Sequence, residues 1–270
     1  MPELPEVETT RRGIQPHIQG KVVTQVIIRQ PRLRWPIPRE LPKLLKRRKL
    51  LEIKRRGKYL LLRFSNGHLL LHLGMSGNLR VLPTDSMPNK HDHFDLVFGA
   101  QCLRLHDPRR FGAVLWTDQN IEQHPLLEKL GPEPLSDKFS GEHLYQLSRP
   151  RRIPVKQFIM DGKVVVGVGN IYANEALFKA GILPTRPCNG ISRKRYMRLA
   201  RAIREILERA IENGGTTLQD FVQADGNPGY FAQQLQVYGK EGEACPDCNT
   251  RIQQVTLGQR SSYYCKRCQR

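Results

Sequence analysis

The sequence of 270 residues has no long apolar segment, no internal repeat and no low-complexity stretch. A membrane-spanning helix needs about 20 mostly apolar residues, and the leucine runs at 60–62 and 69–71 are short enough to be strands. The first residues are acidic and no apolar stretch follows them, so we expect no secretory signal peptide. These absences predict a cytoplasmic protein whose six cysteines are reduced.

Acidic residues are also scarce. The chain has 25 Asp and Glu against 44 Lys and Arg, which gives a formal net charge of +19 and a pI near 10.1. A folded protein with this excess is expected to bind a polyanion. Nucleic acid is the first candidate; an anionic membrane surface is the second, and nothing else supports it. Between Arg29 and Lys58 there are 13 basic residues and two acidic ones, a density that favours phosphate contacts over an ordinary solvated charge run.

The first half of the chain predicts a helix followed by short strands. The helix is expected at 3–13, closed by Gly13. Strands at 59–64 and 68–73 flank Ser65-Asn66-Gly67, which is a hairpin turn signal. Further strands are predicted at 21–28, 94–98, 101–106 and 112–117. Several short strands separated by turns indicate a β-sandwich.

The second half is helical in pattern. A helix is predicted at 170–180, and the clearest one at 192–213, where Ser192 is the expected N-cap and Gly214 lies past the end. Its apolar residues recur every four positions and its basic residues occupy the opposite, solvated face. We place a domain boundary near 131–135 and the start of a third unit near 236. The expected domains are 1–131, 132–235 and 236–270.

Four cysteines form two C-x-x-C pairs, Cys245 with Cys248 and Cys265 with Cys268, separated by 16 residues. This is zinc-ribbon spacing, and four thiolates complete a closed tetrahedron, so we expect one structural zinc ion. Two disulfides are the alternative, which a reducing compartment disfavours. The segment between the pairs, 252–264, predicts a hairpin with Arg260 at its tip. Cys102 and Cys188 have no partner signature.

The chain begins with Met1-Pro2-Glu3. Pro2 is small enough for the initiator methionine to be removed, which would leave a secondary amine as the first atom. Such an amine can attack an aldehyde carbon and form an iminium, with the Glu3 carboxylate in reach of the same carbon. The alternative is an ordinary helix start, in which proline and glutamate suit the first turn.

A second candidate site is the segment VVVGVGNIY at 164–172. Two glycines end an apolar run and open a helix, so unpaired N–H groups, the helix dipole and the Asn170 amide surround one point, which is a ready anion site. A dinucleotide-binding loop is the alternative. It is disfavoured because Tyr172 stands where G-x-G-x-x-G needs its third glycine, and because the surroundings are helical. A nucleic-acid phosphate is the better candidate.

Taken together, these segments resemble one family. The segments PELPEVE at 2–8, DPRRFG at 107–112 and GVGNIY at 167–172, followed by the zinc ribbon, come in the order seen in bacterial formamidopyrimidine-DNA glycosylases. HLGMSG at 72–77, KHDH at 90–93 and GNPGYF at 226–231 also fit, and the resemblance runs from Pro2 to the last cysteine. It implies an α+β multidomain protein with an N-terminal β-sandwich, a helix-two-turn-helix domain and a C-terminal zinc finger.

The resemblance also implies an activity. Family members excise oxidised purines, chiefly 8-oxoguanine and formamidopyrimidines, and then cleave the strand at the abasic site. The expected partner is double-stranded DNA that contains oxidised purines or abasic sites, and the expected state is a monomer. The chemistry requires no redox or nucleotide cofactor. An amine displaces the damaged base, the resulting iminium acidifies the C2′ protons, and β- and δ-elimination release the two phosphates.

Site residues follow from the resemblance residue by residue. Pro2 would be the nucleophile at C1′ and Glu3 the proton donor that opens the sugar ring. Lys58 would take part in base release and elimination, and Arg260 would grip the phosphate beside the lesion. Met75, Arg109 and Phe111 are expected to fill the gap left by the extruded base, with Arg109 facing the orphaned cytosine. The other expected DNA contacts are His91, Lys156, Asn170 and Arg152. Arg152 stands where some family members carry a lysine.

Two alternatives stay open at this point. The sister family, endonuclease VIII, excises oxidised pyrimidines and shares the Pro-Glu start and the zinc finger. The spelling of the N-terminal segment, the Arg109–Phe111 pair and the segment 216–230, which corresponds to a loop over the flipped base, favour the purine enzyme. The other alternative is a DNA-binding protein without catalysis, which would have no need of a free N-terminal proline.

Overall fold

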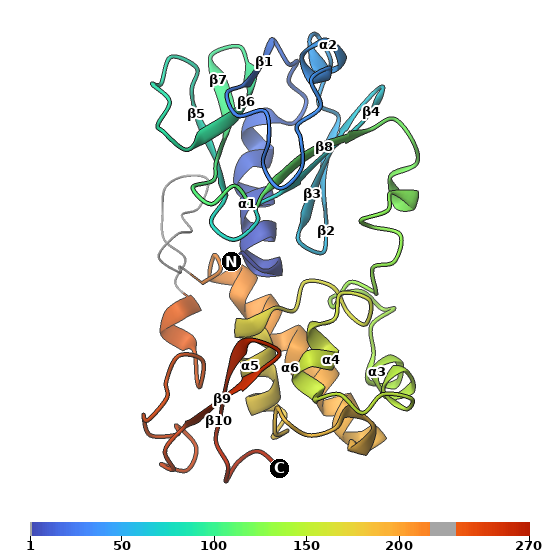
Figure 1. Cartoon of the computed structure of the whole chain (residues 1–270), viewed down its shortest axis with the longest axis vertical. Helices are drawn as coiled ribbons and strands as arrows, with labels where there is room; N and C mark the ends of the chain where they lie inside the picture. Colours follow the sequence, from blue (N-terminus) through green and yellow to red (C-terminus); the bar gives the residue numbers. More distant parts are fainter. Residues whose placement is uncertain (1, 217–230) are drawn as a thin grey trace. The chain divides into compact units, whose positions relative to one another are not determined.

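The structure is a computed structural model that describes residues 2–216 and 231–270. The chain divides into two compact units, the first comprising Met1–Glu128 and Asn213–Ala232, the second Lys129–Glu212 and Gln233–Arg270 (Figure 1). Apart from its first residue, the segment 216–230, expected to cover the flipped base, lies outside the described residues. The structure groups the cysteine-bearing segment with the helices of unit 2. The two domain boundaries expected from the sequence stay predictions.

Unit 1 contains two antiparallel four-stranded sheets. Their inward-facing residues, among them Leu62 and Leu71 of one sheet and Phe94 and Leu103 of the other, bury in one common core. This confirms the predicted β-sandwich. The strands are β1 (Gln25–Ile28), β6 (Asp92–Phe98), β7 (Gln101–His106) and β5 (Asn78–Pro83) in one sheet, and β2 (Glu52–Arg56), β3 (Tyr59–Phe64), β4 (Gly67–His72) and β8 (Ala113–Thr117) in the other, each in spatial order.

Helix α1 (Leu4–Ile18) contacts strands of both sheets. The prediction that it ends at Gly13 was wrong: the helix continues through Gly13 and Pro16, because Ile14 and Ile18 bury completely in the sandwich core. Burial of two large aliphatic side chains outweighs the local penalties of glycine and proline.

The strand predicted at 21–28 was wrong in its first half. Only Gln25–Ile28 pairs as β1, and Val22 makes an isolated bridge to Lys49. The sequence reading also missed the short helix α2 (Leu41–Leu45), which lies in the basic segment, and it named neither β2 nor β5 as a strand. The remaining strands were confirmed to within two residues at each end.

The described residues of unit 2 form four α-helices: α3 (Gly141–Ser148), α4 (Val155–Met160), α5 (Asn170–Lys179) and α6 (Arg193–Glu212). They also form the hairpin of β9 (Gln253–Leu257) and β10 (Arg260–Tyr264), which lies between the two cysteine pairs. Unit 2 also has a short 3-10 turn at Cys188–Gly190. Two more 3-10 turns lie at Ile121–Gln123 in unit 1 and at Phe231–Gln234, where the chain passes from unit 1 to unit 2. The start of α5 and the apolar face of α6, formed by Leu199, Ile203, Leu207 and Ile211, are as predicted.

Arg204 corrects the prediction of a solvated basic face on α6. Its guanidinium donates to the backbone carbonyls of Ser136 and Phe139 and lies 5.7 Å from the centroid of the Phe139 ring. It therefore fastens the 136–139 turn to α6. Periodicity could not distinguish it from its exposed neighbours, since the acceptors lie more than 60 residues away.

The zinc-ribbon segment is attached to α5 by a buried carboxylate. Glu175 accepts backbone N–H groups from Gln236, Val237 and Tyr238 at 2.8–3.0 Å. Burial raises the pKa of Glu175, although these three donors oppose the shift. The finger's small core, which includes Phe178 of α5, packs next to this contact. Within the described part of the chain, no helix is long and apolar enough to cross a bilayer.

Candidate functional site

Pro2 and Glu3 precede α1 and are buried. Glu3 occupies the N-cap position, and its backbone N–H donates to Glu6 Oε2 at 2.8 Å. The other Glu6 oxygen accepts the N–H of Thr216 at 2.8 Å, a contact between residues 210 apart in sequence. Glu6 thus fixes the first turn from two sides. The positive end of the helix dipole lies at this turn and disfavours protonation of an amine placed there.

Lys58 lies in the two-residue turn between β2 and β3, next to Gly57, which needs its positive φ of 57°. This hairpin turn is tied to α1 by Arg55, whose Nε donates to Glu8 Oε2 at 3.1 Å and whose Nη1 donates to the Gly57 carbonyl at 3.0 Å. The element that carries Lys58 is therefore anchored to the helix that begins beside Pro2 and Glu3.

Glu8 is the anchor of this contact. Burial alone would raise the pKa of the Glu8 carboxyl, but hydrogen bonds from Arg11 and Arg12 and the charges of Arg11 and Arg55 lower it to about 2. The carboxylate is 2.8–3.1 Å from nitrogens of all three arginines. It therefore stays charged throughout the physiological range.

His72 ends β4 within the same sheet and was not singled out from the sequence. Burial lowers its pKa to about 4, and the positive charges of Lys58 and Arg34 act in the same direction. The neutral ring accepts the Gly74 N–H at Nδ1, 3.0 Å away, and packs 4.9 Å from the Tyr59 ring. His72 thus accepts a hydrogen bond from the turn that contains Met75 and lies near enough to Lys58 to feel its charge.

The structure brings the three expected gap-filling residues onto two neighbouring turns of unit 1. Met75 lies between β4 and β5, and Arg109 and Phe111 lie between β7 and β8. The Arg109 guanidinium stacks 5.0 Å from the Phe111 ring centroid. Phe111 is 45% exposed, so its ring is accessible to a partner, and its role in filling the gap stays a prediction.

His91 is half-buried and precedes β6. Its ring lies edge-on to those of His93 and His106, with centroids 6.2 and 5.9 Å away. The His91 carbonyl accepts the N–H of Asp107 at 3.0 Å, which places it beside the turn that carries Arg109 and Phe111.

In unit 2, Asn170 begins α5 after Gly169, as predicted, and Gly167 adopts the positive φ of 81° that the turn needs. The Asn170 Oδ1 atom is buried, and no hydrogen-bond partner for it lies among the described residues. The helix-terminal N–H groups suit an anion, but an amide oxygen accepts hydrogen bonds and does not bind one, so the phosphate contact of Asn170 stays a prediction. Arg152 is exposed and lies three residues before α4.

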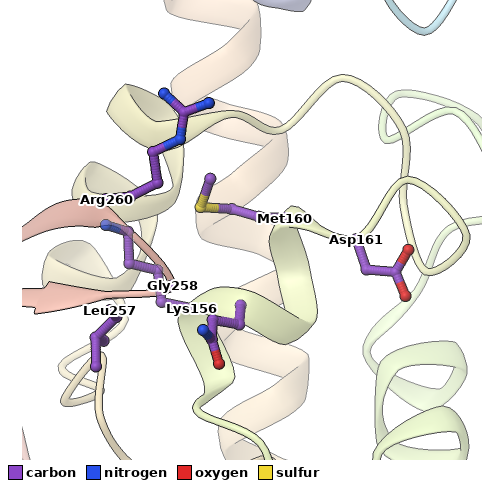
Figure 2. A pocket seen from close by; sticks show the side chains of 7 residues that line it. Lys156, Met160, Asp161, Leu257, Gly258 and Arg260 are labelled. Atoms are coloured by element: carbon purple, nitrogen blue, oxygen red, sulfur yellow. The ribbon is translucent and has the colours of Figure 1, made fainter.

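Arg260 and Lys156 border a pocket of about 240 Å³ between the finger hairpin and α4 (Figure 2). Arg260 is exposed at the first position of β10, and its guanidinium extends away from Leu257 (Figure 2). Lys156 is 1% exposed, and its Nζ donates to the Ser261 carbonyl at 2.6 Å and to Ser262 Oγ at 2.7 Å. The structure thus gives Lys156 a role as a tether between α4 and the hairpin, and phosphate contact stays a prediction.

The four cysteines meet at one point. Their Sγ atoms lie within 4.8 Å of one another, with Cys245 to Cys268 at 3.9 Å and Cys248 to Cys265 at 3.4 Å. Tetrahedral zinc with Zn–S bonds of about 2.3 Å requires sulfur separations of about 3.8 Å, so the donor set fits the ion. The disulfide alternative was wrong, because no two of the six cysteines are bonded to each other. Burial raises the pKa of the Cys102 and Cys188 thiols, which disfavours their reactive thiolate form.

Three residues of this region were missed by sequence reasoning: Glu6, Glu8 and His72. Glu6 stands three positions after the N-cap and could have been found as a capping-box residue. Glu8 has a local signal as well, since Arg11 and Arg12 lie three and four positions after it on the same helix. His72 has none, because Lys58 and Arg34 lie near it only in the tertiary fold.

Three family models match, described as Formamidopyrimidine-DNA glycosylase N-terminal domain (residues 1–114), Formamidopyrimidine-DNA glycosylase H2TH domain (130–222) and Zinc finger found in FPG and IleRS (242–270). The formamidopyrimidine-DNA glycosylase of Psychromonas ingrahamii is 58% identical over 269 residues, which is 100% of both chains.

Solved structures match over the full length as well. A Lactococcus lactis FPG variant in complex with Fapy-dG-containing DNA has a TM-score of 0.92 at 33% identity, and MutM in complex with DNA containing carbocyclic 8-oxo-G has 0.91 at 33%. Each comparison covers 100% of this chain and 100% of the other. The architecture of sandwich, helix-two-turn-helix domain and zinc finger is thereby confirmed.

Proposed function

Because this chain belongs to the formamidopyrimidine-DNA glycosylase family, we propose that it excises oxidised purines from duplex DNA through an N-terminal proline Schiff base and then cleaves the abasic site by β- and δ-elimination. It is a DNA glycosylase acting on 8-oxoguanine and formamidopyrimidine lesions, and it carries abasic-site lyase activity. The observation that carries the mechanism is the placement of Pro2 and Glu3 at the buried start of α1.

The chemistry begins at Pro2 once Met1 has been removed. The secondary amine attacks C1′ of the damaged nucleotide, the glycosidic bond breaks, and the base leaves. Attack requires a neutral amine; an α-amino group has an unperturbed pKa of roughly 7.7–8.0, and the helix dipole favours the neutral form further. Glu3 donates the proton that opens the sugar ring, which completes the iminium.

Elimination follows from the iminium. The positive nitrogen acidifies the C2′ protons; loss of one of them releases the 3′ phosphate, and a second elimination releases the 5′ phosphate. Lys58, held at its turn by the Arg55–Glu8 contact, acts in base release and elimination. Glu6 keeps the first turn of α1 in place during both steps.

DNA is held by residues of both units. Arg260 and Asn170 bind phosphates near the lesion, Arg152 binds a further phosphate, and Lys156 supports the Arg260 hairpin in addition to its predicted phosphate contact. Taking a base out of the stack costs a few kcal/mol, and Met75, Arg109 and Phe111 offset part of that cost by filling the gap. His91 contacts the backbone beside them.

The zinc ion is structural in this scheme. Four thiolates leave no open coordination position, so the ion fixes the two knuckles and holds the hairpin that presents Arg260. The partner is duplex DNA with oxidised purines or abasic sites, and the protein is expected to act as a monomer in the cytoplasm, associated with the nucleoid.

Borohydride trapping tests the mechanism. The protein is incubated with a duplex containing 8-oxoguanine opposite cytosine, the imine is reduced, and the adduct is mapped by mass spectrometry. An adduct on Pro2 with Met1 absent supports the proposal, whereas an adduct on a lysine overturns the role of Pro2. Tight binding without adduct or strand cleavage would favour the non-catalytic DNA-binding alternative.

Two controls sharpen this experiment. Glu3→Gln should bind the duplex and fail to excise the base. A duplex with an oxidised pyrimidine, assayed in parallel, tests the endonuclease VIII-like alternative, which requires that it be cut much faster than the 8-oxoguanine duplex.

A further inference from the structure

The turn at 73–77, with Met75, and the turn at 107–112, with Arg109 and Phe111, touch through their backbones. Gly74 has a φ of +66°, and a Cβ placed on it would lie 2.4 Å from the Phe111 carbonyl carbon and 2.5 Å from the Gly112 nitrogen. No side chain fits between the two turns. The three expected gap-filling side chains therefore stand on one continuous support.

A buried carboxylate joins the two turns. Asp107 is 0% exposed; its Oδ1 accepts the Ser76 hydroxyl at 3.0 Å, and its Oδ2 accepts the Gly112 N–H at 2.7 Å. The Ser76 oxygen in turn accepts the Arg109 N–H at 3.3 Å. One carboxylate and one hydroxyl thus bond to both turns at the positions that flank the exposed side chains.

The backbone of Asp107 extends this connection to the third DNA-contacting segment of unit 1. Its N–H donates to the His91 carbonyl at 3.0 Å, and its carbonyl lies 2.9 Å from His93 Nε2. Asp107 therefore contacts the segments that carry Met75, Arg109, Phe111 and His91, although it is itself inaccessible to DNA.

We propose that Asp107, acting with Ser76, is the positioning residue that sets Met75 against Arg109 and Phe111 before DNA binds, so that the three side chains enter the duplex together. The inference rests on the proposed function, because it assumes that these side chains fill the gap left by the extruded base. Turns that moved independently would have to be ordered during binding, which carries an entropic cost; a carboxylate that already holds both removes it. Asparagine would keep the bond to the Gly112 N–H through its Oδ1, but its NH2 would face Ser76 Oγ, so the Ser76 hydroxyl would lose the carboxylate that accepts its hydrogen.

The test compares two rate constants for each variant, both under single turnover. One is base excision from a duplex with 8-oxoguanine opposite cytosine, and the other is strand cleavage at an abasic site prepared beforehand in the same duplex, where no base has to be extruded. We expect Asp107→Asn to lower the ratio of excision to cleavage about tenfold, as loss of one hydrogen bond to a buried charge implies. Ser76→Ala should lower the ratio by a smaller factor.

Asp95→Asn is the matched control: Asp95 is a carboxylate of the same sandwich, 1% exposed, bonded to Arg29 and Arg104. It should leave the ratio unchanged.

A second readout reports insertion directly. In the Glu3→Gln background, 2-aminopurine placed beside the lesion should gain fluorescence as the stack opens, and Asp107→Asn or Ser76→Ala should reduce that gain at saturating protein. Phe111→Ala is the benchmark for a lost gap-filling side chain.

The outcomes separate the inference from its premise. If Phe111→Ala reduces the fluorescence gain and neither Asp107→Asn nor Ser76→Ala does so, the positioning role is wrong and the gap-filling role survives. If Phe111→Ala leaves the gain unchanged, the gap-filling role is wrong and the inference fails with it. An equal fall of the ratio in Asp95→Asn would reduce Asp107 to a general stabiliser of the fold. If Asp107→Asn does not fold, the rate ratio and the fluorescence gain of Ser76→Ala decide whether the positioning role holds.

Discussion

His72 makes the stability of unit 1 depend on pH. Its ring is half-buried beside Tyr59 and near the charges of Lys58 and Arg34, and its pKa is lowered from 6.5 to about 4. The unfolded chain therefore binds a proton below pH 6.5 that the folded protein does not take up until about pH 4. Stability contributed by the neutral ring is complete above pH 6.5 and is lost as the pH falls from 6.5 to 4.

The size of the effect follows from the shift. A difference of 6.5 − 4, or about 2.5 pKa units, corresponds to about 3 kcal/mol at low pH, at about 1.4 kcal/mol per unit. By pH 5 the loss should already be about 2 kcal/mol. His72→Asn removes the titration and keeps an oxygen where Nδ1 accepts the Gly74 N–H. The free energy of unfolding of the variant should therefore fall less than that of the wild type between pH 7 and 5.

Two measurements check this prediction. Urea unfolding at a series of pH values gives the difference between variant and wild type, in which the other titrating groups cancel. Histidine NMR of the eight imidazoles gives the pKa of His72 itself, assigned by its absence from the variant spectrum. A His72 resonance that titrates near pH 6.5, or equal pH slopes for the two proteins, would refute the reasoning.

Four further predictions concern other parts of the molecule. Cys248→Ser should lose zinc and DNA affinity together, as metal analysis and a binding titration would show, since the finger's fold depends on the closed site. Lys156→Met should destabilise the hairpin by about 2–3 kcal/mol, because a charged donor to two acceptors is lost; thermal unfolding measures it, and an unchanged Tm would contradict the tether. Glu8→Gln should flatten acid unfolding between pH 4.5 and 2, where the wild-type carboxylate, with its pKa lowered to about 2, progressively loses its contribution. Phe111→Ala should leave Tm unchanged, since the ring is exposed, and slow cleavage of a long duplex more than that of a short one.

Most of the fold followed from local pattern. Short apolar runs on either side of the Ser65-Asn66-Gly67 turn predicted the hairpin β3–β4, and the recurrence of apolar residues every four positions predicted α6. The errors arose where tertiary burial overrode local signals: α1 passes Gly13 and Pro16 because Ile14 and Ile18 reach the core. Helix propensity registers Gly13 and Pro16 as helix-breaking residues but contains no information on the tertiary packing that overrides them.

The candidate site divides in the same way. The Pro2-Glu3 start and the cysteine pairs are local motifs, and the sequence alone predicts their chemistry: an amine nucleophile for the first and zinc binding for the second. The contacts that support the other candidate residues have no local signal, because the partners are distant in sequence: Glu6 with Thr216, Ser76 with Asp107, and Lys156 with Ser262. Buried hydrogen bonds of this kind become visible only when the fold brings the segments together.

The return of the chain from unit 2 to unit 1 at Asn213 has a consequence for biosynthesis. Glu6 meets its partner Thr216 only after 210 further residues have been added, which takes a ribosome roughly 10–40 s at 5–20 residues per second. Removal of Met1 can thus precede completion of the turn beside it by many seconds. A nascent chain exposes its N-terminal proline early but completes the Glu6–Thr216 contact only after the helices of unit 2 have been synthesised. Translation products that end before Thr216 should therefore lack this contact.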